Sequence, residues 1–380
     1  MFLFCEDIRN RFRIDKFLRY STIRLCYIYG TSYHNLSNQG ENSLSIIEVK
    51  QLSKSFRQAV KEPGLKGSVK HLFVPKYIDK VAVKPLDLTI EAGESVAYVG
   101  PNGAGKSTTI KMLTGILVPT SGTIAVNGIN PHKKRMENAQ QIGAVFGQRT
   151  QLWWDIPIVE SFSLLKDIYQ IPEVTYKSNL DQFIELLGMN EFIHLSARKL
   201  SLGQRMRADL AASLIHNPPI LYLDEPTIGL DVSVKQKIRE FIKKINQEQR
   251  TTVMLTTHDL GDIEDLCQRL IIIDQGSIIY DGSLEQVKRH FSKERKIFFQ
   301  VTSTRLSLFT EISDVPGLKL AVLSELEFSI SFDRYQYTAS DVVSRVMKHG
   351  EIQDFRMEES NIEQVIKAVY DGKLDLNQTL

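Results

Sequence analysis

One eight-residue stretch, Gly100 to Ser107, constrains what this chain can fold into more than any other. Its sequence, GPNGAGKS, fits the pattern G-x-x-x-x-G-K-[ST] of a phosphate-binding loop. An apolar run at 96–99 precedes it and a helical pattern at 108–117 follows it, which is the strand–loop–helix context that the motif requires. Glycines let backbone N–H groups turn toward phosphate oxygens, and the helix start adds partial positive charge. The stretch therefore predicts a nucleoside triphosphate site rather than a chance glycine-rich turn.

Each residue of this loop has an expected role. Lys106 is expected to reach the outer phosphates, and the Ser107 hydroxyl is expected to ligate Mg²⁺. The complete set expected to contact the nucleotide here is Gly100, Pro101, Asn102, Gly103, Ala104, Gly105, Lys106, Ser107 and Thr108.

Size and composition limit the alternatives. A chain of 380 residues is long enough for two or three domains, and a net charge of +2 gives no electrostatic argument for nucleic acid. The cysteines at 5, 26 and 267 are far apart and form no CxxC, so we expect neither a disulfide framework nor a cysteine metal site. No stretch approaches the roughly 20 apolar residues that span a bilayer. If the protein works at a membrane, another chain must supply the spanning part.

The N-terminal segment, residues 1–44, differs from the rest of the chain. Arginines alternate there with apolar and aromatic residues, and the segment then turns polar. We expect a poorly ordered N-terminal extension, because termini that are not tied into a core are usually loose. A membrane-surface helix and sequence upstream of the true start are the alternatives.

From residue 45 to about 295 the pattern alternates strands with helices, which indicates an α/β sheet. Helical periodicity dominates from about 150 to 215, and this part is interpreted as a helical subdomain. A basic loop around 61–76 is expected to interrupt the first strands. Strands are predicted at 46–49, 86–90, 96–99, 123–126, 220–223, 252–256 and 270–273, and helices at 159–169, 180–187 and 204–215.

The remaining chain, 296–380, predicts a small α+β domain, which could have a ferredoxin-like β-α-β-β-α-β order. It carries no catalytic constellation in its sequence, so a structural or regulatory role is favoured. Strands are predicted at 297–301, 318–323, 328–332 and 352–355, and helices at 340–348 and 361–370.

Two carboxylates follow a buried strand at 220–223. Asp224 is suited to holding Mg²⁺, and Glu225 is suited to accepting a proton from the attacking water. An acidic turn at a strand end is the ordinary alternative. The phosphate loop upstream favours the catalytic interpretation.

The stretch LSLGQ at 200–204 closely resembles the LSGGQ signature of ABC-type ATPases. On its own, Ser201 or Gly203 would be interpreted as the start of the helix that follows. The resemblance implies that Ser201, Gly203 and Gln204 clamp the γ-phosphate held by the opposite subunit. Leu202 departs from the family pattern, which leaves the fine geometry there open.

Further elements of the same family follow in order. Gln148 resembles the glutamine that senses Mg²⁺ and the membrane partner, and Asp231 resembles the aspartate of the D-loop. His258 resembles the switch histidine that contacts the γ-phosphate. Phe56 is preferred over Tyr77 as the aromatic that stacks on adenine, since stacking needs only an aromatic face.

Taken together, the resemblance implies a P-loop NTPase of the ABC type over 45–295, with an antiparallel β subdomain and a helical subdomain. It implies ATP and Mg²⁺ as ligands and a head-to-tail dimer with a second ATP-binding subunit. It also implies a separate transmembrane permease and a place on the cytoplasmic face of the membrane. The stretches 146–157 and 227–231 resemble a subgroup of bacterial multidrug or polymer exporters.

Two other function classes stay in view. A soluble ABC-type ATPase in translation or DNA maintenance is disfavoured, because the chain has one nucleotide-binding domain, no sustained heptad run and a near-neutral charge. An inactive regulatory module is disfavoured because Lys106, Asp224, Glu225 and His258 are all present. The sequence does not predict the transported substrate, because the surfaces that determine substrate specificity are expected in the membrane partner.

Overall fold

The computed structural model describes residues 45–60, 76–147, 149–291, 294–302, 312, 315–359 and 365. The predicted N-terminal extension, Gln148 and the basic loop at 61–75 lie outside these residues. The predicted helix at 361–370 also lies outside them, apart from Val365.

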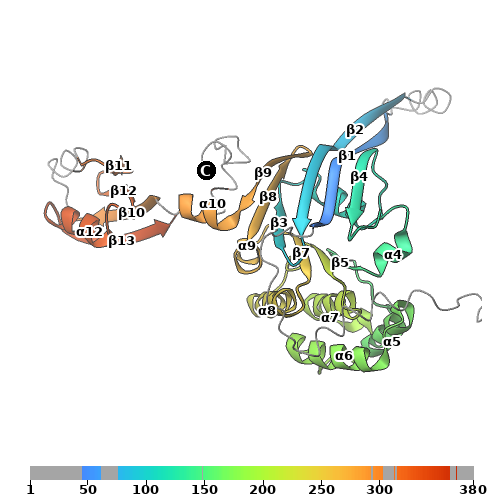
Figure 1. Cartoon of the computed structure of the whole chain (residues 1–380). Coiled ribbons are helices and arrows are strands. Elements are labelled where there is room, and N and C mark those ends of the chain that lie inside the picture. Colours follow the sequence, from blue (N-terminus) through green and yellow to red (C-terminus); the bar gives the residue numbers. More distant parts are fainter. Residues whose placement is uncertain are drawn as a thin grey trace, which may run out of the picture. The chain divides into compact units, whose positions relative to one another are not determined.

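A six-stranded sheet in the order β5-β6-β7-β3-β8-β9 forms the centre of the nucleotide-binding part (Figure 1). Neighbouring strands from β5 to β8 run parallel, and β9 pairs antiparallel with β8. Apolar runs such as Leu221–Leu223 are buried on both faces, as parallel sheets require. Because β3, β6 and β7 are parallel neighbours, the loops that follow them emerge at one edge. The bounds are β3 Ser95–Val99, β5 Ile142–Phe146, β6 Ile220–Asp224, β7 Thr252–Thr256, β8 Arg269–Asp274 and β9 Ser277–Ser283.

Helices cover one face of this sheet and bury a large apolar cluster against it (Figure 1). Phe162 of α5, Phe183 of α6 and Phe241 of α8 are among its fully buried side chains. The helices on this face are α5 Ile158–Tyr169, α6 Glu173–Leu187, α7 Leu202–Leu214, α8 Val232–Gln249, α9 Leu260–Leu266 and α10 Leu284–Phe291, with a 3₁₀ turn at Ala197–Lys199. Helix α3 Lys106–Leu113 packs into a separate apolar cluster on the other face, and α4 spans Arg135–Ala139. None of the helices among the described residues is long and apolar enough to cross a membrane.

Helix α6 corrects one sequence expectation. It begins directly after Pro172, whereas the apolar periodicity predicted a start at residue 180. The first two turns are mostly polar and hide only Tyr176 and Asn179, so their periodic signal is weak. Pro172 supplies the fixed backbone angle that suits the entry to a helix.

A second sheet, of three antiparallel strands in the order β2-β1-β4, packs a separate apolar cluster against the other side of the central sheet. Its strands are β1 Ser45–Val60, β2 Lys76–Glu91 and β4 Ser121–Val126. Strands β1 and β2 form a much longer hairpin than the short strands predicted at 46–49 and 86–90. Beyond Leu52 the alternation of buried and polar residues is lost, so no periodic pattern predicts a strand there.

The C-terminal residues form a four-stranded antiparallel sheet in the order β11-β12-β10-β13. Its elements are β10 Glu294–Val301, β11 Leu318–Val322, β12 Glu327–Asp333, α12 Ala339–Met347 and β13 Ile352–Glu359. Val342 and Val346 of α12 pack on Phe299, Phe328 and Ile330 of the sheet. The strand order and directions match those of the β-α-β-β-α-β arrangement.

Candidate functional site: the phosphate loop and the sheet edge beside it

The phosphate loop lies between β3 and α3 and depends on its glycines. Gly105 stands at the start of α3 in the left-handed region, with φ of 112°. A side chain at Gly100 would place its Cβ 2.2 Å from the carbonyl oxygen of Ile273 on β8. Only glycine fits both positions, which lets the loop lie close against the sheet.

Lys106 lies at the first position of α3 and is 7% exposed. Its Nζ donates hydrogen bonds to the carbonyl oxygens of Gly100 and Pro101, the second at 3.2 Å. Burial lowers the pKa of its ammonium group, although the carboxylates of Glu225 and Asp224 act in the opposite direction. The ammonium group is thus held over the loop by two backbone carbonyls, near the carboxylates of Glu225 and Asp224.

Asp224 and Ser107 meet at this edge as the sequence predicted for a magnesium site. The Ser107 hydroxyl donates to Oδ1 of Asp224 at 3.3 Å, and the Thr256 hydroxyl donates to the same oxygen at 2.6 Å. These are hard oxygen donors on two rigid elements, α3 and the end of β6, and such donors fit Mg²⁺. Their arrangement also matches the family pattern, in which a loop hydroxyl and an acidic residue flank the ion.

Glu225 follows Asp224 in an unusual backbone conformation, with φ of 54°. Its side chain faces His258, whose Nε2 lies 3.1 Å from Oε1 of the glutamate. Non-glycine residues in this conformation are uncommon and concentrate at functional sites. This conformation directs the Glu225 carboxylate away from the axis of β6 and toward the loop that follows β7.

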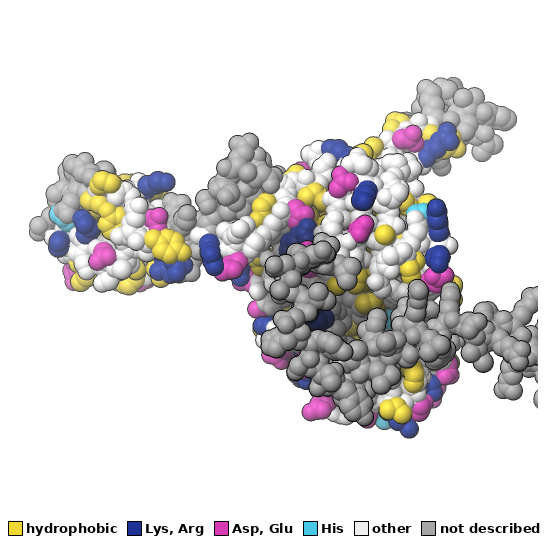
Figure 2. Space-filling view, in the orientation of Figure 1, with side chains coloured by type: hydrophobic (Ala, Val, Ile, Leu, Met, Phe, Trp, Pro, Cys, Tyr) yellow, Lys and Arg dark blue, Asp and Glu magenta, His cyan; other side chains and the backbone are white. Residues whose placement is uncertain are grey.

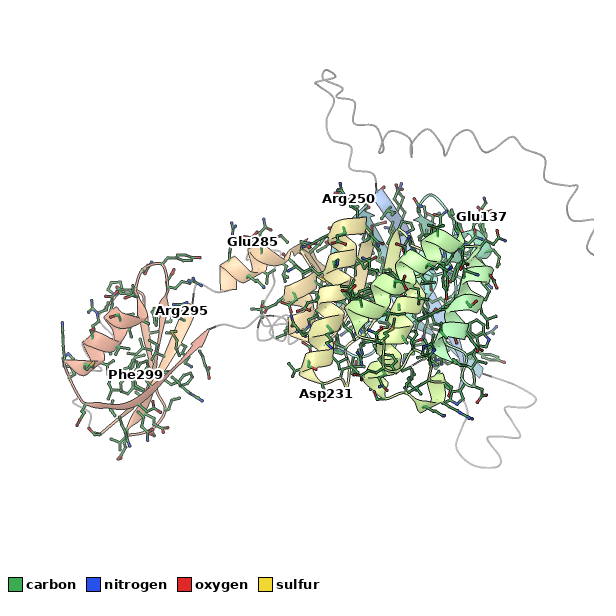
Figure 3. All side chains as sticks on the ribbon, turned by 90° about the horizontal axis from the view of Figure 1, so that it is seen from below. Glu137, Asp231, Arg250, Glu285, Arg295 and Phe299 are labelled. Carbon is green, nitrogen blue, oxygen red and sulfur yellow. The ribbon has the colours of Figure 1, made fainter. Side chains whose placement is uncertain are left out.

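A cavity of about 260 Å³ lies beside this pair. Its walls come from the loop after Glu225, the loop that carries His258, and the first turn of α8; they comprise Glu225, Thr227, Ile228, Gly229, Lys235, Thr257, His258 and Asp259. Asp231 stands at the start of α8, and Arg250 follows the other end of that helix (Figure 3). The Asp231 side chain makes no capping hydrogen bond.

The signature stretch begins α7. The Ser201 side chain accepts from the N–H of Gln204 at 3.2 Å, and the Gln204 side chain accepts from the N–H of Ser201 at 2.9 Å. This reciprocal pair is a capping box, so the structural interpretation of Ser201 is correct whatever else it does. Gly203 lies close to Val234 of α8, where a Cβ would be 3.3 Å from a methyl group.

Leu202, which departs from the signature pattern, packs against the neighbouring D-loop. Its Cδ2 atom lies 3.4 Å from the position that a Cβ on Gly229 would take. The larger side chain is therefore accommodated by a glycine with φ of 70° on the facing loop. The exposed Ser201 and the half-buried Gln204 keep their places at the helix start.

The sequence interpretation missed Asp209, a buried carboxylate in the middle of α7. Its Oδ1 accepts from the Thr150 hydroxyl and from the Gln151 N–H, both at 2.9 Å. Burial raises the pKa of this carboxyl to about 6, against the effect of those hydrogen bonds. An acidic residue within an otherwise apolar helix face was the available signal. Asp209 thus holds the segment at Thr150 and Gln151 against α7, the helix of the signature stretch.

The adenine-stacking candidates lie on the β1–β2 hairpin. Phe56 is 37% exposed with Lys54 Nζ 5.2 Å from its ring centre, and Tyr77 is 47% exposed with the Arg57 guanidinium 4.2 Å from its ring centre. Both rings are accessible, and both stay candidates for stacking on adenine.

Charged groups of both signs are interspersed among the described residues on the face shown in Figure 2. That pattern accords with the near-neutral net charge of +2.

Comparison with known proteins places these features in a family. The family model described as "ABC transporter" matches residues 83–228. The chain is 34% identical to the ABC transporter ATP-binding protein NatA of Bacillus subtilis over 206 residues, which are 54% of this chain and 83% of the relative. It is 30% identical to the methionine import ATP-binding protein MetN 2 of Enterococcus faecalis over 319 residues, 80% of this chain and 87% of the relative. It is 29% identical to the linearmycin resistance ATP-binding protein LnrL of Bacillus subtilis over 292 residues, which are 76% of this chain and 93% of the relative.

A solved structure agrees with this placement. The dimeric post-hydrolysis state of the ATP-binding cassette MJ0796, bound to ADP and Pi, superposes with a TM-score of 0.52 and 26% identity. The match covers 63% of this chain and 98% of that one. The sheet and the phosphate loop are those of this family, and the matches cover most of the length of each relative. The chain therefore belongs to the ATP-binding subunits of ABC transporters and is an ATPase.

Proposed function

We propose that this chain hydrolyses ATP with Glu225 as general base and His258 as its partner at the γ-phosphate. The observation that carries the proposal is the Glu225–His258 pair, 3.1 Å apart, at the edge where Ser107 also contacts Asp224. Nucleophile activation and phosphate binding would thus occur side by side. Proton acceptance by a positioned carboxylate is the usual role for such a group.

Each residue has a defined task in this proposal. Lys106 and the loop N–H groups hold the β- and γ-phosphates, and the lysine leaves the loop carbonyls to reach them. Glu225 accepts a proton from the water that attacks phosphorus, and His258 orients that carboxylate and the γ-phosphate. Ser107, Asp224 and Gln148 would hold Mg²⁺, which neutralises charge that develops on the phosphate oxygens.

The site is proposed to be completed by a second ATP-binding subunit. Ser201, Gly203 and Gln204 begin α7, and an exposed helix start presents free N–H groups to an anion. In a head-to-tail dimer they would face the γ-phosphate held by Lys106 of the other subunit. ATP would then close the dimer, and hydrolysis would reopen it.

We further propose that the chain works on the cytoplasmic face of the membrane with a separate permease, and that the transporter is an exporter. Support for the direction comes from the stretch at 146–157, which resembles exporter ATPases, and from the relative named for linearmycin resistance. The relative named for methionine import argues for the opposite direction.

Co-purification tests the partner. The tagged full chain is isolated from mildly solubilised membranes, with the Glu225→Gln variant in ATP to hold the closed state. A stoichiometric polytopic membrane protein is the expected result. Ribosomes or DNA in its place would overturn the transporter assignment of this chain, and transport into inverted vesicles would settle the direction.

A further inference from the structure

A fully buried carboxylate outside the proposed catalytic set lies behind the Glu225–His258 pair. Asp262 of α9 has 0% exposure and accepts three hydrogen bonds. Its Oδ2 accepts from the hydroxyls of Thr227 and Thr257, the second at 2.9 Å, and its Oδ1 accepts from Nε of Arg239 at 2.7 Å.

These partners come from three different segments. Thr227 lies two residues after Glu225, and Thr257 directly precedes His258. Both threonines are themselves buried, with 1% and 3% exposure. Arg239 belongs to α8, the helix that begins after Asp231. One side chain thus joins the loop of the general base, the loop of the switch histidine and the helix that follows the D-loop.

Arg239 extends the connection on its far side. It also contacts Asp259 at 2.9 Å and, less closely, Asp265 at 3.4 Å. Asp259, the N-cap of α9, in turn accepts from the N–H of Gly261 at 3.0 Å. The guanidinium lies so close to Gly261 that a Cβ there would be 2.6 Å from its nitrogens. Arg239 therefore has little room to move away from Asp262.

We propose that Asp262 is a positioning residue for hydrolysis, holding the loops of Glu225 and His258 in one fixed relationship. This inference rests on the roles proposed for those two residues. Asp262 touches neither the nucleotide nor the reacting water. It acts by fixing the two loops that carry the groups which do.

The physical basis is the cost of breaking any one of its bonds. A buried carboxylate that loses a donor retains an unsatisfied charge, which costs more than the bond itself contributes. Either loop can therefore shift only if the other shifts with it, or if Asp262 moves too. The D-loop and the switch loop should therefore move together when a neighbouring subunit binds, because the same carboxylate also holds α8.

The test compares Asp262→Asn with Asp265→Asn in the full chain. Asparagine has the same shape, but an NH₂ group replaces one of the two acceptor oxygens. In either orientation of the amide, this NH₂ group would face a hydrogen-bond donor, which is Arg239 on one side and the two threonines on the other. We expect ATPase turnover of Asp262→Asn to fall at least about ten-fold, while equilibrium ATP binding changes less than about two-fold. Asp265→Asn removes an exposed carboxylate from the same helix and the same arginine, and should retain turnover within about two-fold.

A double variant separates positioning from a general loss of structure. Groups that act as a unit are not additive, so adding Asp262→Asn to His258→Ala should reduce turnover less than about two-fold further. Losses that multiply would overturn the proposal. If Asp262→Asn does not fold, Thr257→Val should lower turnover in the same way without affecting ATP binding. It removes at constant shape the hydroxyl that donates to Asp262 and accepts from the N–H of Asp259.

The outcomes also separate this inference from the proposed function. Wild-type turnover in Asp262→Asn, alongside loss in Glu225→Gln and His258→Ala, would refute the role of Asp262 alone. Wild-type turnover in all three variants would refute the proposed catalytic residues themselves.

Discussion

His258 and Glu225 face each other across two loops, with Nε2 of the histidine 3.1 Å from Oε1 of the glutamate. The two loops follow β7 and β6, which are parallel neighbours in the central sheet. Thr256, at the end of β7, reinforces the arrangement: its carbonyl accepts from the N–H of Glu225 at 2.9 Å. The pair is therefore set by main-chain contacts as well as by side chains.

Replacing Glu225 by Gln should stop turnover and leave nucleotide binding intact. The amide keeps the size of the side chain but cannot accept the proton, so we expect at least a ~100-fold loss of ATPase turnover. ATP affinity should stay within about two-fold, because the phosphate contacts remain. Steady-state hydrolysis and equilibrium binding measure the two effects.

Glu248→Gln, at an exposed position of α8, is the matched control and should hydrolyse ATP normally. Unchanged turnover in Glu225→Gln would remove Glu225 from the role of general base.

Ser201→Arg should impair ATP-driven dimerisation by crowding the phosphate of the opposite subunit. The substitution also removes an N-cap, which by itself costs about 1 kcal/mol of stability. Ser201→Ala removes the cap without adding bulk, so it isolates that effect. Size-exclusion chromatography with light scattering, in ATP and in a Glu225→Gln background, measures the dimer. Dimers of normal affinity in Ser201→Arg would show that the clamp assignment is wrong.

Phe56→Ala should weaken ATP binding more than Tyr77→Ala does. Stacking of an aromatic pair contributes about 1 kcal/mol beyond burial, so a roughly five-fold rise in Kd is expected for Phe56→Ala alone. The two rings lie on one hairpin with similar exposure, which makes each variant the control for the other. A larger loss in Tyr77→Ala would transfer the stacking role to Tyr77.

His216→Phe should remove part of the acid sensitivity of the fold. The His216 ring stacks on Tyr169 with 3.9 Å between ring centres, and burial lowers its pKa to about 4, against the effect of its contact with Ile142. His216 therefore binds a proton near pH 6.5 in the unfolded chain, but only near pH 4 in the folded chain. Stability from this neutral histidine is full above pH 6.5 and is lost as pH falls toward 4.

Phenylalanine keeps the stacking and cannot titrate. Between pH 7 and pH 4, the free energy of unfolding should therefore fall less in His216→Phe than in the wild type, by on the order of 3 kcal/mol. Urea unfolding at several pH values measures this difference, and His194→Phe at an exposed position controls for ring replacement. Parallel curves for the wild type and His216→Phe would contradict the expectation.

Local patterns in the sequence predicted the parts of the site that are continuous along the chain. The strand before Gly100 and the helix after Ser107 are both present, because the spacing of glycines, Lys106 and apolar residues encodes that turn directly. The cap at Ser201 was likewise readable, since a capping box needs only residues three apart. Patterns failed where polar residues continue a strand or helix, as in β1 beyond Leu52 and in the first turns of α6.

The sequence by itself determined which chemical groups are available: a phosphate loop, two strand-end carboxylates, a signature helix and a switch histidine. Only the tertiary structure decided which of them touch. Strand β7 lies between β6 and β3, although β3 is far from both in sequence. This order brings the Ser107 hydroxyl to Asp224 and the loop of His258 to Glu225. Asp262 and Asp209 have no local motif, because their partners come from other segments. Sheet order and burial, rather than any short pattern, give those carboxylates their contacts.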